Sequence, residues 1–431
     1  MKIAIIGGAG ARAPLLTHGI AQTGIPISEV ALYDISTERL EAIGSLAKEF
    51  ATGFKVTSST ELSDCISGAD FVFTCIRVGG IHQRAEDEAT ALAQGQLGQE
   101  TVGACGFAMA MRTIKVMIEY AQQIKELAPQ AWIINFTNPV SIITQAVKKE
   151  TGARIIGICD TPTELFEDVV HGLGVPSSQC VFDFFGLNHL GWLREVYFRG
   201  EPLLARIWED PKLLRDIYRS PLFETDFLRG LRLLPTEYLY YYYRPEFAAE
   251  NIRKTGTSRG REIARMNDRF FEEVNSPGIA PKTAYRDYID ARDASYMKIE
   301  SGDTGDRKQP DWGELTGYDQ IAMSVVGAIS SNSNIVLPLN VENRGNLDCL
   351  EDDDIVEVPC LVNSNGAIPL SVGTTSESVN GLITEVKNYE RLTIEAAVSG
   401  DLSLAVKALA ANPLIANEDI AAKLIKELGI L

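Results

Sequence analysis

Short apolar runs alternate with longer amphipathic segments along the first 160 residues. In residues 37–50, the side chains of Leu40, Ile43, Leu46 and Phe50 recur at helical spacing. The apolar runs between such segments are typical of strands that are buried on both faces. They predict strands at residues 2–7, 29–34, 55–59, 70–75, 131–136 and 154–159.

Helix signals follow several of these strands. Residues 106–127 are expected to form a long helix, and Asn138-Pro139 resembles an N-cap with proline at the first helical position. Residues 161–164 (TPTE) resemble a capping box that opens another helix. Repeated βα units with buried strands predict an α/β fold with an N-terminal doubly wound, Rossmann-type parallel sheet.

The pattern changes beyond about residue 175. Two strands are expected at 180–186 and 191–198, then an aromatic-rich helical region, strands at 335–339 and 355–362, and amphipathic helices within 402–428. Residues 301–312 are polar and predict a loop, and the acidic run 351–354 predicts a solvated turn. We therefore expect a dinucleotide-binding domain at 1–165 and a mixed α+β domain for substrate, metal and oligomer contacts at 166–431.

Composition excludes several classes of function. Lys and Arg number 40 and Asp and Glu 58, so the net charge of −18 argues against nucleic-acid binding. No apolar run reaches the ~18 residues of a membrane span, and the apolar start enters a glycine turn instead of continuing as a signal peptide. The seven cysteines are odd in number and scattered. They favour a reducing cytoplasm over a disulfide framework.

A glycine cluster follows the first predicted strand. Gly7, Gly8 and Gly10 allow close backbone approach to a pyrophosphate at a helix N-terminus, with Arg12 in the same turn. A tight strand-to-helix turn explains the glycines equally well. The βα context and Asp34 at the end of the second strand favour a dinucleotide, because a carboxylate there binds a ribose 2′-OH and repels a 2′-phosphate. NAD+ is therefore expected over NADP+.

Polar side chains follow three further predicted strands. Arg77, Asn138 and the pair Cys159-Asp160 would meet in one crevice, because the carboxyl ends of parallel strands share one edge of a sheet. Cys159 with His189, which lies in a turn between two strands, is a possible metal pair. Buried cysteines and single histidines are more often structural, and a soft-ligand pair alone would suggest zinc.

A tyrosine-rich segment and two arginine sites complete the candidates. Residues 233–243 (LLPTEYLYYYY) hold five tyrosines, which form either an aromatic core or subunit contact or include a phenolic general base. Arg84 and Arg259 are candidate anion sites that would suit a phosphorylated substrate. The commoner outcome for a single arginine is a surface ion pair.

Taken together, these residues resemble the NAD- and metal-dependent family 4 glycoside hydrolases, most closely the 6-phospho-β-glucosidase branch. The matching stretches span most of the chain: residues 5–16 (IIGGAGARAPLL), 75–88 (CIRVGGIHQRAEDE), 95–114 (GQLGQETVGACGFAMAMRTI), 134–144 (INFTNPVSIIT), 157–162 (GICDTP), 186–192 (GLNHLGW), 233–243 (LLPTEYLYYYY) and 355–370 (IVEVPCLVNSNGAIPL).

The resemblance implies an unusual hydrolysis of phosphorylated β-glucosides. NAD+ takes hydride from C3 of the sugar, the ketone acidifies the C2 proton, a base removes it and the C1 leaving group is eliminated. Water then adds at C1 and NADH returns the hydride, so the net reaction is hydrolysis without the usual pair of carboxylates. A divalent metal bridging the C2 and C3 oxygens would stabilise the enediolate.

The resemblance also assigns roles to individual residues. Cys159 and His189 match the metal ligands, normally for Mn2+. Asp160 matches the acid that protonates the leaving group. Tyr238 is the best match to the base at C2, although the neighbouring tyrosines leave room for a shift of two or three positions.

Further assignments concern the substrate and the cofactor. Asn138, with Asn188 beside the metal ligand, is expected to bind sugar hydroxyls. Arg84 and Arg259 match the 6-phosphate contacts, and Arg77 is assigned to the cofactor. The family further implies a homodimer or homotetramer.

Two stretches depart from the family pattern. The glycine loop reads Gly-Ala-Gly-Ala-Arg at residues 8–12, where many members have Gly-Gly-Ser followed by a tyrosine or threonine. Residues 103–106 have Ala-Cys where Pro-Gly is usual, which leaves the sugar preference open. The alternatives are a 6-phospho-α-glucosidase, an enzyme for unphosphorylated α-glycosides, a 2-hydroxyacid dehydrogenase of the lactate or malate type, and an inert sugar-phosphate or NAD sensor.

Overall fold

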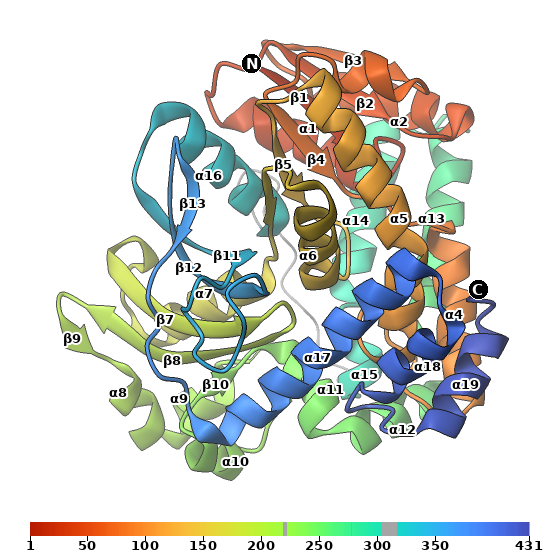
Figure 1. Cartoon of the computed structure of the whole chain (residues 1–431). Coiled ribbons are helices and arrows are strands. Elements are labelled where there is room, and N and C mark those ends of the chain that lie inside the picture. Colours follow the sequence, from red (N-terminus) through yellow and green to blue (C-terminus); the bar gives the residue numbers. More distant parts are fainter. Residues whose placement is uncertain (219–221, 277, 303–316, 431) are drawn as a thin grey trace.

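The apolar runs of the N-terminal part form the parallel portion of a large sheet. The computed structural model describes residues 1–218, 222–276, 278–302 and 317–430. Within them the nine-stranded sheet has the order β13-β12-β11-β6-β5-β4-β1-β2-β3 (Figure 1). Its strands are β1 (Lys2–Ile6), β2 (Glu29–Tyr33), β3 (Lys55–Ser59), β4 (Phe71–Thr74), β5 (Trp132–Asn135), β6 (Ile155–Gly157), β11 (Ile335–Glu342), β12 (Ile355–Asn363) and β13 (Gly366–Pro369).

Strands β1 to β6 are all parallel. Strand β1 lies between β2 and β4, with Ile3 opposite Val30 on one side and Phe71 on the other. Strands β3, β5 and β6 extend the parallel sheet outwards. The predicted doubly wound sheet is confirmed, and the carboxyl ends of these strands lie along one edge.

The C-terminal strands complete the same sheet. Strand β11 meets β6 with Asn340 opposite Gly157, and β12 and β13 continue in antiparallel pairing. The sheet thus contains strands from both sides of the expected boundary at 165/166, and that division stays a prediction. Strand β13 was not predicted, because its four residues carry too short a pattern to detect.

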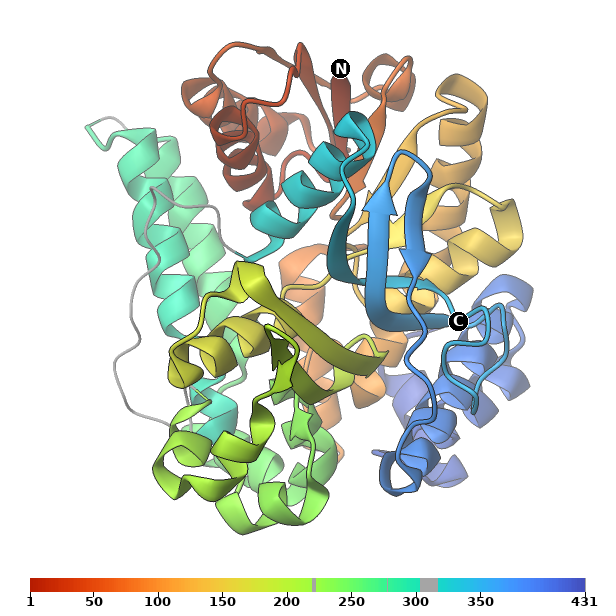
Figure 2. The ribbon, with the colours of Figure 1, turned by 90° about the vertical axis from the view of Figure 1, so that its left-hand side faces the viewer.

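Helices cover both faces of the sheet. Helices α5, α6 and α17 pack together on one face, and α1, α2 and α16 on the other (Figures 1 and 2). The longer helices are α1 (Arg12–Gln22), α2 (Thr37–Phe50), α4 (Gly80–Ala93), α5 (Gly103–Leu127), α6 (Val140–Thr151), α7 (Thr161–Leu173), α12 (Pro245–Thr255), α13 (Arg259–Val274), α14 (Pro281–Ala294), α16 (Gly317–Ser331), α17 (Glu377–Ser399), α18 (Leu402–Ala410) and α19 (Glu418–Glu427).

Shorter helices occur mainly between residues 177 and 301. They are α3 (Leu62–Ile66), η1 (Ser177–Gln179), α8 (Leu204–Glu209), α9 (Pro211–Asp216), α10 (Thr225–Leu231), η2 (Glu237–Leu239), α11 (Tyr240–Tyr243) and α15 (Lys298–Ser301).

A second, antiparallel sheet lies below the first in Figure 1. It comprises β7 (Cys180–Leu187), β8 (Leu190–Phe198), β9 (Glu201–Pro202) and β10 (Leu234–Pro235). Strands β7 and β8 form a hairpin whose two-residue turn is Asn188-His189. The two strands predicted here are confirmed, and β7 also packs against β12 of the large sheet.

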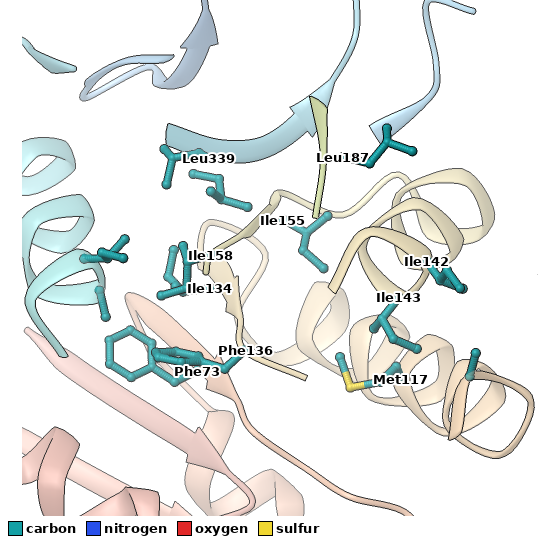
Figure 3. Packing of buried hydrophobic residues seen from close by; sticks show 14 of the residues in the cluster. Phe73, Met117, Ile134, Phe136, Ile142, Ile143, Ile155, Ile158, Leu187 and Leu339 are labelled. Carbon is teal, nitrogen blue, oxygen red and sulfur yellow. The ribbon is translucent and has the colours of Figure 1, made fainter. Parts of the chain in front are cut away.

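The core fills the space between the large sheet and its helices. Figure 3 shows Phe73 beside Phe136, with Ile134 and Ile158 next to them. The rings of Phe73 and Phe136 lie 5.4 Å apart. These side chains lie at or just beyond the carboxyl ends of three adjacent strands, β4, β5 and β6. Their packing holds the strand ends that carry the site.

Some local predictions were wrong. Helix α6 begins at Val140 with Pro139 as N-cap, and α7 has Asp160 as N-cap without a side-chain capping bond, so neither predicted cap forms. Asp354, expected to be solvated, is buried and accepts hydrogen bonds from Arg391.

Two further predictions concern the loop and the membrane. The loop predicted at 301–312 falls outside the described residues from 303 onwards. In the described part of the chain, no helix combines the length and apolar character needed to cross a membrane.

Candidate active site

A cavity of about 2490 Å3 opens where the parallel strands end. Residues that follow β1, β2, β4, β5 and β6 line it. This agrees with the rule that ligands of such sheets bind at the carboxyl ends of the strands. The predicted residues that line it are Gly7, Gly10, Arg12, Asp34, Arg77, Arg84, Asn138, Asp160, Tyr238 and Arg259. Four others do not line it: Gly8, Cys159, Asn188 and His189.

The glycine loop is held against the ends of β2 and β4. The N–H groups of Gly7 and Gly8 both donate to the Tyr33 carbonyl, at 3.0 and 2.8 Å. Gly7 has a φ of 96°, and a Cβ there would lie 2.6 Å from the carbonyl oxygen of Cys75. A side chain would therefore push the turn away from the strand, which explains why glycine is needed at this position.

Asp34 lies at the end of β2 and lines the cavity. Its Oδ2 accepts a hydrogen bond from the N–H of Ala9 at 3.1 Å, and its Oδ1 accepts one from the N–H of Ser36 at 3.3 Å. These bonds fix the carboxylate beside the glycine loop. This is the arrangement by which an acidic residue binds a ribose hydroxyl in dinucleotide-binding folds.

Arg12 faces an aromatic residue that the sequence did not single out. Its guanidinium lies 4.1 Å from the ring centre of Tyr318, a cation–π contact. The Tyr318 ring also lies 5.8 Å from the ring of Phe136, and its hydroxyl is 3.8 Å from Sγ of Cys159. Tyr318 thus lies between Arg12 and Cys159. It is remote from every strand end in sequence and sits in no motif.

Cys159 follows β6 and is completely buried. Its Sγ lies 3.4 Å from Oγ1 of Thr161. Burial raises the pKa of the Cys159 thiol well above its usual value. The sulfur is therefore protonated in the free protein, and a metal that bound it would displace the proton.

His189 occupies a strained position in the β7–β8 turn. Its φ of 62° is the left-handed conformation that glycine or asparagine usually adopts. Non-glycine residues in this region are concentrated at functional sites. Burial lowers the pKa of His189 to about 4, so the imidazole is neutral at pH 7, which is its metal-binding form.

The donor set fits a metal only as an open site. The described residues contain no group of three or more His, Cys, Asp or Glu side chains arranged to hold an ion. Cys159 and His189 lie behind the cavity wall, next to residues that line it: Asp160 follows Cys159, and Tyr238 stacks on His189. A pair of ligands would leave positions for substrate oxygens, as catalytic sites require. A second observation points to a ligand: Oδ1 of Asn138 in the cavity wall is buried and has no hydrogen-bond partner.

Tyr238 is distinguished from its neighbours by its contacts. Its ring stacks on the imidazole of His189, with centroids 3.8 Å apart and planes within 5°. Tyr243 instead accepts a hydrogen bond from the Trp192 indole, and Tyr241 donates to Sδ of Met297. Burial raises the pKa of Tyr238, which is therefore neutral in the free protein.

Asp160 lines the cavity immediately after Cys159. Burial raises the pKa of Asp160 to about 6, although the charge of Arg12 opposes that rise. A carboxyl group with a pKa near neutrality can be protonated in a working enzyme and donate its proton. This matches the role of an acid facing a leaving group.

The predicted anion-binding arginines differ in availability. Arg84 is buried and ion-paired with Glu88 at 2.8 Å and with Glu100. Arg77 also pairs with Glu100. Burial alone would raise the pKa of Glu100, but the two guanidinium groups outweigh it and hold that pKa well below its usual range.

Arg259, unlike Arg84, forms no ion pair within the described residues. It donates to Oγ of Ser295 at 3.2 Å and lies over the ring of Tyr296 at 5.0 Å. Arg292 also lines the cavity, and no ion pair holds its side chain within the described residues. Sequence reasoning missed Arg292 and Glu100. Glu100 lies in a stretch that carried the family resemblance, whereas Arg292 has no such signal.

Comparison with known proteins shows the family of the chain. The model of the family 4 glycosyl hydrolases matches residues 2–175, and the model of the family 4 glycosyl hydrolase C-terminal domain matches residues 184–415. The chain belongs to glycosyl hydrolase family 4. This family 4 enzyme is 30% identical to a probable 6-phospho-beta-glucosidase of Bacillus subtilis, over 99% of this chain and 95% of the relative. It is 29% identical to a phospho-alpha-glucosidase of Clostridium acetobutylicum, over 99% and 96%.

Solved structures of relatives have the same fold. The 6-phospho-beta glucosidase of Thermotoga maritima with NAD and glucose-6-phosphate matches with a TM-score of 0.84 at 28% identity, covering 99% of this chain and 97% of the other. A 6-phospho-alpha-glucosidase from gut microorganisms with NAD and Mn2+ matches at 0.80 and 27%, with the same coverage. A lactate dehydrogenase at 0.54 and 15% identity, covering 92% and 98%, shares the fold alone.

Proposed function

We propose that this family 4 glycoside hydrolase is a 6-phospho-β-glucosidase that uses NAD+ and Mn2+ or another divalent metal. The observation that carries the proposal is the cavity that joins the glycine loop and Asp34 to Tyr238, Asp160, Arg84 and Arg259. The B. subtilis relative supports the β configuration. A 6-phospho-α-glucosidase is the second candidate, since the C. acetobutylicum relative is almost as similar.

Each residue has a defined task in this reaction. NAD+ supplies reversible hydride acceptance at C3, and a divalent metal supplies electrostatic stabilisation of the C2 and C3 oxygens. Cys159 and His189 would hold the metal. Tyr238 takes the C2 proton at its phenolic oxygen, and Asp160 gives a proton to the departing C1 oxygen.

Substrate binding uses the amides and the arginines. The unpartnered Oδ1 of Asn138 accepts a hydrogen bond from a sugar hydroxyl. Asn188, which was also expected to bind the sugar, does not line the cavity; it donates to Glu357 and would orient the turn that carries His189. Arg259 binds the 6-phosphate with a bidentate contact, and Arg84 adds positive charge that Glu88 and Glu100 partly neutralise. Arg77 lies beside the cofactor.

The cofactor preference follows from Asp34. Its carboxylate would accept a hydrogen bond from the ribose 2′-OH of NAD+ and repel the 2′-phosphate of NADP+. Gly7, Gly8 and Gly10 bring the backbone close to the pyrophosphate, and Arg12 adds a charge where other members use a hydroxyl.

The setting of the reaction is part of the proposal. All seven cysteines are free thiols, and the metal pair needs a reduced Cys159, which favours the cytoplasm. We expect a homodimer or homotetramer that acts on imported small phosphorylated sugars. The net charge of −18 is unfavourable for binding to nucleic acid.

The decisive assay uses p-nitrophenyl β-glucoside 6-phosphate with NAD+, Mn2+ and dithiothreitol. Nitrophenol release that stops when NAD+ or metal is omitted, without accumulation of NADH, is the expected result. Release from the α-anomer or the unphosphorylated glucoside instead would keep the mechanism and change the substrate. No release from any of them would refute the proposal.

A further inference from the structure

Glu357 carries a buried carboxyl group that does not line the cavity. It is the third residue of β12 and is 1% exposed. Its Oε1 accepts hydrogen bonds from Nδ2 of Asn340 at 2.7 Å and from Nδ2 of Asn188 at 3.4 Å. Within the described part of the chain, no Lys, Arg or His forms an ion pair with it. A buried carboxyl group without hydrogen bonds is costly, and these two amides give Oε1 its hydrogen-bond donors.

These two amides belong to the segments that carry the candidate metal ligands. Asn340 in β11 lies opposite Gly157, the last residue of β6, and Cys159 follows two residues later. Asn188 immediately precedes His189 in the β7–β8 turn. One carboxylate oxygen therefore connects the end of β6, through β11, to the turn that carries His189.

The packing around this connection is apolar. Figure 3 shows Leu339 of β11 and Leu187 of β7 on either side of the segment that carries Ile155 and Ile158. These side chains are all buried. Backbone pairing fixes β6, β11 and β12 relative to one another, whereas β7 belongs to the other sheet and packs against β12 without strand pairing. The hydrogen bond from Asn188 to Glu357 is a directional contact between the turn after β7 and β12.

We propose that Glu357 is a positioning residue that holds Cys159 and His189 at the separation a divalent cation requires. This inference rests on the proposed function, because it takes these two residues as the metal ligands. Partners behind the ligands commonly orient them, and their loss weakens metal affinity about 10–100-fold. The strained φ of His189 adds a need for such an anchor, since an unanchored turn would relax.

Mn2+ binding to the protein, followed by the EPR signal of free Mn2+, tests this role without any turnover. Glu357→Leu removes both hydrogen bonds and should weaken Mn2+ binding at least about 10-fold. Glu357→Gln keeps an acceptor oxygen for both amides and should stay within about 3-fold of the wild-type affinity. Asn340→Ala breaks one of the two links and should give an intermediate loss.

The control is Glu342→Leu, which removes a carboxylate from the same strand as Asn340. Glu342 is 26% exposed and pairs with Arg344, so its loss should leave Mn2+ affinity unchanged. NAD+ affinity, measured by calorimetry, should be unchanged in every variant and shows that the fold is intact. If Glu357→Leu fails to fold, Asn340→Ala and Glu357→Gln still decide the question.

The outcomes separate the inference from the proposed function. Wild-type Mn2+ affinity in Glu357→Leu, together with lost affinity in Cys159→Ser, would overturn the positioning role and leave the function intact. Unchanged affinity in Cys159→Ser would show that the metal is held elsewhere and would overturn both. An equal loss of Mn2+ and NAD+ affinity in Glu357→Leu would indicate general damage and would also count against the positioning role.

Discussion

A buried lysine connects α17 to the sheet and gives a quantitative test of the packing. Lys387 is completely buried, and its Nζ donates to Oγ of Ser141 at 3.1 Å, Oε1 of Gln145 at 3.0 Å and the carbonyl of Ile355 at 2.7 Å. It also pairs with Glu390. Every hydrogen of the ammonium group thus has an acceptor, in a region where water does not reach.

Replacing Lys387 by Met removes the charge and leaves its acceptors behind. Glu390 is 5% exposed, and among the described residues it would keep only the Ser141 hydroxyl as a donor. Breaking a buried pair on one side costs about 3–5 kcal/mol, because the remaining charge is uncompensated. We therefore expect the free energy of unfolding to fall by about 4 kcal/mol. The double variant Lys387→Met/Glu390→Leu should recover most of that loss, because the uncompensated carboxylate is then gone.

The assay is urea unfolding followed by tryptophan fluorescence and circular dichroism. Lys254→Met is the control, because Lys254 pairs with Glu250 at 2.8 Å but the two side chains are 67% and 54% exposed. An exposed pair of this kind on one helix is worth only about 0.3–0.5 kcal/mol. If Lys387→Met costs no more than Lys254→Met, or if the double variant is as unstable as the single one, the argument from burial is refuted.

Three further predictions concern the cavity. Asp34→Ser should weaken NAD+ binding, and it should reduce the preference for NAD+ over NADP+ at least about 10-fold, because it removes the charge that repels a 2′-phosphate. Calorimetric titration with both cofactors measures this preference. An unchanged preference would exclude Asp34 from the ribose site. Tyr318→Leu removes the ring under Arg12 and should change NAD+ affinity by about 0.5–2 kcal/mol, whereas Tyr318→Phe should not. Burial raises the pKa of Asp319 from 3.8 to about 7, so ionisation of this carboxyl group opposes folding. The free energy of unfolding should therefore fall as the pH rises from 3.8 to 7, by at most about 4 kcal/mol. Asp319→Asn should be the more stable protein at pH 8 but not at pH 4, and equal stability at both values would contradict this reasoning.

The N-terminal fold was predictable because its signals are local. Apolar runs, helical spacing and the glycine turn each arise within a few neighbouring residues. They place the ends of β1 to β6 to within about two residues. The N-caps of α6 and α7 were less predictable. Each predicted cap, at Asn138 and at Thr161, lies one position away from the observed cap, at Pro139 and at Asp160. Asp354 was misread for a different reason: its partner Arg391 lies 37 residues away, and charge patterns do not reveal such pairs.

The site was predictable where a residue follows a strand or sits in a recognisable stretch. Asp34 and Asp160 line the cavity for this reason. Tyr318 and Arg292 reach it from helices far along the chain, so only the tertiary structure brings them in. Arg84 and Glu88 lie four residues apart on one helix, so their ion pair follows from local spacing, whereas the second pair, with Glu100, appears only in the tertiary structure. The two pairs determine how much charge remains for a substrate.

The placement of β11 beside β6 has a consequence for biosynthesis. While the ribosome is still adding the middle of the chain, the outer edge of β6 has no partner, because Asn340 has yet to be made. An open strand edge is a template for pairing with other nascent chains. Translation at about 5–20 residues per second keeps that edge open for seconds. We therefore expect fragments that stop before Ile335 to aggregate or to be retained by chaperones, whereas chains that extend past β13 are released.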